Sequence, residues 1–186
     1  LYAGLRPGVT RESFEAALRG GEDVSGLLQR IDSAAGDAMF LPSGRVHAIG
    51  AGNVIVEVQQ NSDTTYRVYD FDRPGLDGRP RELHVDASLA SIDWDDVQPG
   101  LVVPDGETLV RTDVFAVERW VLAAGRQRRA TEPGECAIVS LLEGAVAAGG
   151  LPVSPGELAL VPADAADPHL RAGQDGATVL RITMPD

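Results

Sequence analysis

Residues 35–47 read Ala-Gly-Asp-Ala-Met-Phe-Leu-Pro-Ser-Gly-Arg-Val-His, a pattern that indicates a β-strand between two turns. A Gly-acid turn opens a four-residue apolar strand that ends in proline. Residues 155–166 repeat the pattern, with Gly156 to Pro162 in the places of Gly36 to Pro42. Such a repeat predicts that the same β unit is used twice. His47 lacks a counterpart in the second copy, so we expect chemistry in the first half and a structural role for the second.

Short apolar runs separated by Gly, Pro and Asp clusters dominate the chain and predict β-strands at 38–41, 53–59, 65–71, 116–123, 136–142, 158–161 and 178–183. Regular spacing of such strands is typical of a sandwich or a barrel. Helical periodicity occurs in a segment that Thr10 can cap, in residues 24–31, and after Asp86. The sequence therefore predicts an all-β fold with a few short helices.

The chain divides into three regions by composition. We expect residues 1–93 to form part of a β-barrel with a helical insertion. Residues 94–112 are rich in Asp, Pro and Gly and read as a linker. A second β domain follows over residues 113–186.

Composition excludes several classes of function. The formal net charge is -12, which argues against a nucleic-acid or anionic-membrane partner. All 16 basic residues are arginine, so a catalytic lysine is excluded from this chain. Cys136 is the only cysteine, which suits the cytoplasm and excludes a thiolate-rich zinc site. No apolar run approaches the length of a membrane span.

His47 is the strongest candidate for chemistry. Pro42 ends the preceding strand and Gly44 allows a sharp bend, so His47 begins the next strand. This spacing resembles the second motif of the cupin superfamily, in which the histidine binds a metal ion. That motif has Asn four residues after the histidine, where this chain has Ala51. The alternative for His47 is a capping or core histidine at a turn.

The longer run around this motif resembles the type I mannose-6-phosphate isomerases. The resemblance rests on residues 42–50, on Glu57 to Asp70 with its Asn-Ser-Asp-Thr-Thr-Tyr-Arg segment, and on flanking segments at 4–9 and 81–85. It implies a cupin (jelly-roll) barrel followed by a second, metal-free cupin-like β domain. It also implies a zinc-dependent isomerase that interconverts mannose 6-phosphate and fructose 6-phosphate.

The resemblance implies roles for individual residues. His47 matches a zinc ligand, and Arg67 matches an arginine that assists proton transfer and stabilises the enediolate. Glu57, on the polar row of its strand, is a candidate base or ligand-orienting group, against the alternative of a solvated carboxylate. Asp63 is a candidate for substrate binding, although turn capping explains it equally well. Some arginines are candidates for a positive rim around a phosphate: Arg45, Arg73, Arg79 and Arg81.

The set of metal ligands is incomplete in this sequence. Zinc takes three or four protein ligands, and the family's Gln-x-His pair and Glu belong to a segment that precedes the part this chain resembles. We therefore expect an N-terminal segment or a second chain to supply them, and this chain alone to be inactive. The alternative is a non-catalytic cupin module that binds sugars or regulates an enzyme.

Overall fold

The computed structural model describes residues 1–62, 64–71, 73–75 and 77–185. The chain forms two compact units, Leu1–Leu101 and Val102–Asp186. The division falls inside the region 94–112. Among the described residues, no helix has the length and apolar character needed to cross a membrane.

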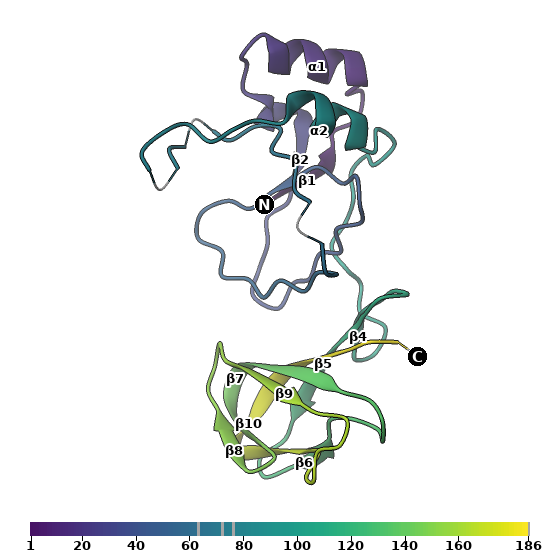
Figure 1. Ribbon diagram of the computed structural model, residues 1–186, viewed down its shortest axis with the longest axis vertical. Helices are drawn as coiled ribbons and strands as arrows, with labels where there is room; N and C mark the ends of the chain where they lie inside the picture. The colour runs from purple at the N-terminus through teal and green to yellow at the C-terminus, as the bar shows by residue number, and fades with distance from the viewer. Residues whose placement is uncertain (63, 72, 76, 186) are drawn as a thin grey trace. The chain divides into compact units, whose positions relative to one another are not determined.

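Unit 1 is built on a three-stranded antiparallel sheet in the order β2-β1-β3 (Figure 1). Its strands are short: β1 (Tyr2–Leu5), β2 (Leu28–Arg30) and β3 (His47–Ala48). The helices are α1 (Arg11–Arg19) and α2 (Val85–Ser91), with the 3-10 helix η1 (Val24–Leu27). They enclose a core made of Leu5, Phe14, Val24, Leu28, Val46 and Leu89.

The helices show how far local sequence signals determine this unit. Thr10 accepts a hydrogen bond from the backbone of Ser13, as its predicted capping role requires, and Gly20 is the C-cap of α1. The helix expected after Asp86 is α2. The expected helix over residues 24–31 is wrong, because only four residues form a 3-10 turn before the chain enters β2. Gly26 disfavours a helix here, and the residues that follow pair with β1 instead.

Unit 2 is a seven-stranded antiparallel sheet that coils around its own apolar core (Figure 1). Its central path runs β4-β5-β10-β7-β8, with β6 paired to β10 and β9 paired to β7. The strands are β4 (Thr108–Arg111), β5 (Ala116–Leu122), β6 (Gln127–Arg129), β7 (Ala137–Ala148), β8 (Leu151–Val153), β9 (Leu158–Val161) and β10 (His169–Thr183). The predicted fold class, all-β with a few short helices, is confirmed.

The repeated β unit is only half confirmed. Gly36 and Gly156 both have positive φ, 92° and 86°, so the same turn opens both copies. The second copy continues into β9, which pairs with β7, but residues 38–41 form no strand. The predicted strands at 53–59 and 65–71 are also absent. Among the described residues these three segments lack a neighbouring strand, and a strand needs one to satisfy its backbone.

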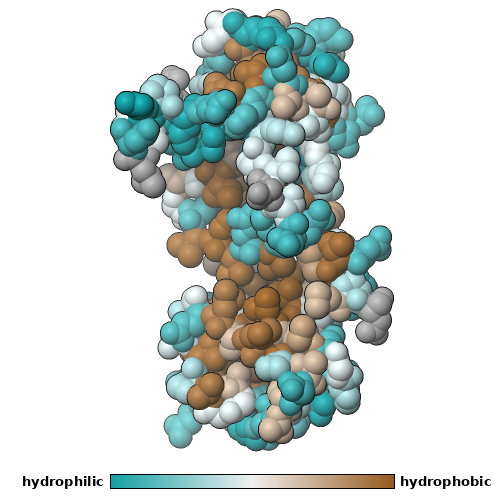
Figure 2. Space-filling view, in the orientation of Figure 1, coloured by the Kyte–Doolittle hydropathy of each residue, from teal (hydrophilic) through white to brown (hydrophobic). Residues whose placement is uncertain are grey.

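Apolar residues are exposed in both units, and Figure 2 shows them as brown areas on the face in view. In unit 1 they fall mainly on the segments that were expected to be strands. Val54 is fully exposed, and Ile55 and Val56 are 50% and 42% exposed. Unit 1 therefore does not by itself form the closed barrel that the resemblance implies.

Candidate functional site

His47 lies at the start of β3, where its backbone pairs with Ala3 of β1. Its side chain is exposed, and its Nδ1 lies 3.1 Å from the backbone oxygen of Arg45. Val46, the preceding residue, is buried in the core of unit 1. The core thus fixes the backbone while the imidazole remains available to solvent.

The turn before His47 is held by a bidentate ion pair. Arg45 donates from Nε and Nη2 to the two carboxylate oxygens of Asp96, at 2.9 and 2.7 Å. Its Nη1 donates to the backbone oxygen of Phe40 at 2.6 Å. Arg45 therefore fixes this turn and does not belong to a positive rim for a ligand.

Gly44 confirms the predicted bend. Its φ is 90°, a conformation that L residues rarely adopt. A Cβ at this position would lie 3.1 Å from the Cβ of Asp93 and 3.1 Å from the backbone oxygen of Ser91. Both the conformation and the close approach require glycine here.

Arg67 lies on a segment anchored to the same core. The next residues, Val68 and Tyr69, pack against the core cluster that also contains Val46. The backbone of Arg67 pairs with His84: the Arg67 N–H donates to His84 Nδ1 at 3.1 Å, and the His84 N–H donates to the Arg67 carbonyl at 2.8 Å. Its Nη1 donates to the carbonyl of Glu82 at 3.2 Å. The guanidinium is thereby held in place, with 30% of the side chain exposed.

The carboxylate of Asp70 lies within ion-pair distance of three arginine side chains. The sequence alone does not predict this cluster. Arg81 donates to both of its oxygens, Nε to Oδ2 at 2.6 Å and Nη2 to Oδ1. Arg73 donates to Oδ1 at 3.3 Å, and Arg67 Nε lies 3.8 Å from the same atom. Hydrogen bonds from Arg81 and then Arg73 lower the pKa of Asp70, so the carboxylate stays ionised. The three-residue spacing of Arg67, Asp70 and Arg73 is the signal that could have indicated this cluster.

Two of the remaining predicted site residues, Glu57 and Arg79, are exposed. Glu57 lies outside any strand. Asp63 lies outside the described residues. Arg79 is exposed and forms no ion pair with Asp70.

The described residues do not form a metal centre on their own. Within the described ranges, no group of three or more His, Cys, Asp or Glu side chains could hold a metal ion. Zinc requires such a group. Among the described residues, His47 therefore belongs to no such group.

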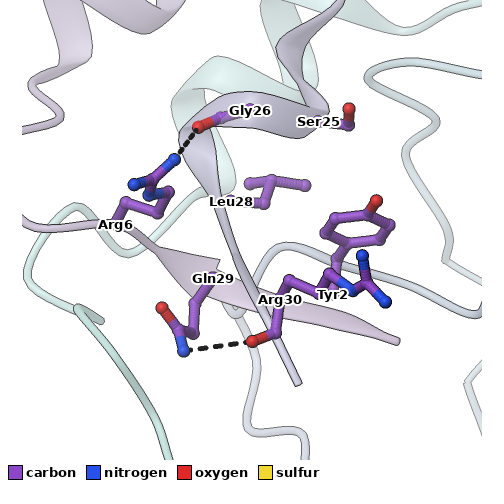
Figure 3. Close-up of a pocket in the computed structure, with 7 residues that line it drawn as sticks. All are labelled: Tyr2, Arg6, Ser25, Gly26, Leu28, Gln29 and Arg30. Carbon is purple, nitrogen blue, oxygen red and sulfur yellow. Dashed lines mark hydrogen bonds between the residues drawn. The ribbon is translucent and has the colours of Figure 1, made fainter. Parts of the chain in front are cut away.

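A separate hollow of about 360 Å³ lies over β1 and β2, lined by Tyr2, Arg6, Ser25, Gly26, Leu28, Gln29 and Arg30 (Figure 3). Arg6 donates from Nη1 to the carbonyl of Gly26 at 3.2 Å, as Figure 3 shows. None of the predicted site residues lines this hollow. We therefore do not connect it with the chemistry around His47 and Arg67.

Comparisons with known proteins show similarity to mannose-6-phosphate isomerases. Mannose-6-phosphate isomerase ManA of Bacillus subtilis is 35% identical over 142 residues, which are 73% of this chain and 44% of the relative. The mannose-6-phosphate isomerase of Streptococcus mutans is 40% identical over 132 residues, covering 66% of this chain and 40% of the relative. No family model matches. The chain thus spans less than half the length of these curated relatives.

Solved structures agree with the sequence matches. The crystal structure of the Bacillus subtilis mannose 6-phosphate isomerase superposes with a TM-score of 0.77 at 29% identity, covering 98% of this chain and 59% of that chain. A putative mannosephosphate isomerase from Archaeoglobus fulgidus, 17% identical with a TM-score of 0.66, shares the fold over all of this chain and 57% of its own. The resemblance predicted from the sequence is confirmed, and the chain is related to the mannose-6-phosphate isomerases over part of their length.

Proposed function

We propose that this chain is part of an aldose–ketose isomerase that interconverts mannose 6-phosphate and fructose 6-phosphate in the cytoplasm. The observation that carries the proposal is the fixed position of Arg67 in a chain that is 35–40% identical to proteins named for this activity. Moving a proton between C1 and C2 of the sugar builds negative charge on two neighbouring oxygens. A preorganised guanidinium stabilises such charge without reorganising during the reaction.

Other residues take supporting roles in this proposal. Glu57 is assigned to proton transfer or to orienting a ligand, because its exposed carboxylate is free to reach a substrate. Asp63 is assigned to substrate binding from the resemblance alone. His47 would bind zinc, which supplies Lewis-acid stabilisation of the same oxygens when bound.

We further propose that polypeptide outside these 186 residues completes the site. The relatives are more than twice as long as the region they share with this chain. Val54, Ile55 and Val56 are exposed and lack a partner strand among the described residues, which is the condition expected of a strand whose neighbour comes from elsewhere. The remaining zinc ligands would come from the same source.

The test is reconstitution of the enzyme. The 186-residue chain is purified alone, and also after co-expression with the complementing segment, defined as the part of Bacillus subtilis ManA that this chain does not match. We expect zinc near zero and no isomerisation for the chain alone. With the complementing segment we expect close to one zinc per complex and formation of fructose 6-phosphate.

Each outcome decides a different part of the proposal. If the chain alone bound one zinc tightly and were fully active, the proposal that other polypeptide completes the site would be wrong. A folded, zinc-loaded complex that does not isomerise the substrate would contradict the proposed isomerase activity. That result would favour the second candidate, a sugar-binding or regulatory module. The support for this candidate is that the described residues contain no group of side chains that could hold a metal ion.

A further inference from the structure

Three hydrogen bonds join Arg67 to residues 82–84, and His84 makes two of them. The Arg67 N–H donates to His84 Nδ1 at 3.1 Å, and the His84 N–H donates to the Arg67 carbonyl at 2.8 Å. In the third, Arg67 Nη1 donates to the carbonyl of Glu82 at 3.2 Å. The backbone and the guanidinium of Arg67 are therefore both attached to the residues that precede α2.

The bond to Nδ1 requires one particular tautomer of His84. A backbone N–H can only donate, so Nδ1 accepts with its lone pair and carries no proton. The proton of the neutral imidazole then lies on Nε2. The alternative tautomer, with its proton on Nδ1, would leave the Arg67 N–H without this acceptor.

Helix capping does not account for this histidine. His84 is the N-cap residue of α2, a position where Ser, Thr, Asp and Asn are the side chains that bind the free backbone N–H groups. In the described part of the chain, the His84 side chain makes no hydrogen bond of this kind. Its ring nitrogen binds the backbone of Arg67 instead.

His84 is itself held in place. The Ser88 N–H donates to the His84 carbonyl at 2.8 Å, which joins His84 to α2. Val85, the next residue, packs against the core of unit 1. The Tyr66 ring lies beside the imidazole, with 6.1 Å between the ring centroids. His84 thus connects Arg67 to a helix that is anchored in the core.

We propose that His84 is a positioning residue for Arg67 in the isomerisation, an inference that rests on the proposed function. A guanidinium stabilises the charge that develops on the sugar oxygens best when it is in place beforehand. Without the Nδ1 acceptor, the Arg67 N–H loses a hydrogen bond and its segment can shift. Because the developing charge belongs to the transition state and not to the bound substrate, kcat should fall while KM changes little.

The first test examines the contact in the 186-residue chain by NMR and needs no activity. Long-range 1H–15N correlations give the tautomer of each histidine. We expect His84 to carry its proton on Nε2 at about pH 8, where imidazoles are ordinarily neutral. We also expect the Arg67 amide to exchange about tenfold faster, or more, in His84→Ala than in the wild type. A proton on Nδ1, or equal exchange rates in the two proteins, would overturn the proposal.

The second test measures the isomerisation of mannose 6-phosphate by the co-expressed complex. His84→Ala should lower kcat about tenfold or more, with KM within about twofold of the wild-type value. His84→Asn places an amide oxygen near the position of Nδ1, so this variant should keep the hydrogen bond and most of the activity. The control is His169→Ala, a partly exposed histidine of unit 2, which should keep wild-type kcat. Zinc content should be equal in all of these proteins.

The outcomes separate the role of His84 from the proposed function. If the wild-type complex shows no isomerisation, the proposed function is wrong, and the role of His84 in the reaction is wrong with it. If the wild-type complex is active and His84→Ala has the same kcat, only the positioning role is wrong. Equal losses of kcat in His84→Ala and His84→Asn would also contradict the positioning role, because a merely structural role of the ring predicts them.

Discussion

Arg45 and Asp96 form a two-point ion pair, Nε to Oδ2 at 2.9 Å and Nη2 to Oδ1 at 2.7 Å, across 51 residues of sequence. Their side chains are only 15% and 12% exposed. The pair ties the turn that precedes His47 to the chain that follows α2. The position of the candidate zinc ligand therefore depends on a contact far from it in sequence.

Removing one partner of this ion pair should lower the stability of unit 1. Arg45→Ala leaves a nearly buried carboxylate without its cation, and we expect a loss of about 2–4 kcal/mol in unfolding free energy. The fluorescence of Trp94, which packs edge-on against Phe14 at 5.7 Å between ring centroids, reports on this unit. The control is Arg30→Ala, whose pair with Asp32 is exposed and should cost less than about 1 kcal/mol. Equal losses for the two variants would contradict the account.

The bend before His47 should require glycine. Gly44→Ala places a methyl group at a positive φ and 3.1 Å from both Asp93 and Ser91, so the variant should lose about 2 kcal/mol or more. Gly8→Ala is the matched control, because its φ of 82° is similar but open space surrounds it. We expect the control to lose only about 1 kcal/mol. Denaturant unfolding gives the free energy of unfolding of both variants. If Gly44→Ala is no less stable than Gly8→Ala, the steric argument is wrong.

The exposed apolar residues of segment 53–59 should contribute to assembly with the complementing segment and not to the folding of this chain. Val54→Asp changes a fully exposed side chain, so the thermal stability of the isolated chain should stay the same. Assembly with the complementing segment, measured by co-purification, should fall at least tenfold, because the charge would lose its hydration in a strand interface. Val103→Asp, at another highly exposed valine in unit 2, should leave co-purification unchanged. Normal assembly of the Val54 variant would contradict the idea that this segment is completed by other polypeptide.

Unit 2 should lose stability at low pH through Asp167. Its carboxylate accepts a hydrogen bond from Arg171 Nη1 at 2.6 Å and contacts His169 Nδ1 at 2.9 Å, and these partners lower the pKa of Asp167 from 3.8 to about 2. Because the pKa is lower in the folded state, the ionised group stabilises the fold above about pH 4. That contribution is lost as the pH falls toward 2.

Asp167→Asn should remove this part of the pH dependence. Acid unfolding followed by the buried Trp120 would show a flatter response between pH 4 and pH 2 in the variant than in the wild type. The control is Asp175→Asn, an exposed residue of β10 that takes part in no ion pair of the described residues. The same slope in Asp167→Asn and wild type would show that Asp167 does not carry the effect.

Local signals in the sequence predicted the parts of the fold that depend on local chemistry. The cap at Thr10, the bend at Gly44 and the strand that became β9 all follow from residue type and spacing. Segments 38–41, 53–59 and 65–71 have the same strand patterns, but a strand also needs a neighbour, which a pattern cannot supply. The sequence also indicated Arg67, Arg73 and Arg81, each as a separate candidate site residue. Their meeting at Asp70 depends on tertiary structure that the pattern of one segment does not encode.

The catalytic role of Arg67 is tested by kcat for Arg67→Ala in the complex with the complementing segment, with mannose 6-phosphate as substrate. Loss of a preorganised charge that stabilises the transition state should lower kcat by roughly 10²–10³-fold. Zinc content should stay the same, because Arg67 is not a metal ligand. Arg111→Ala, an exposed arginine of unit 2, is the control and should keep wild-type kcat. Unchanged turnover in a folded, zinc-loaded Arg67→Ala complex would contradict the account.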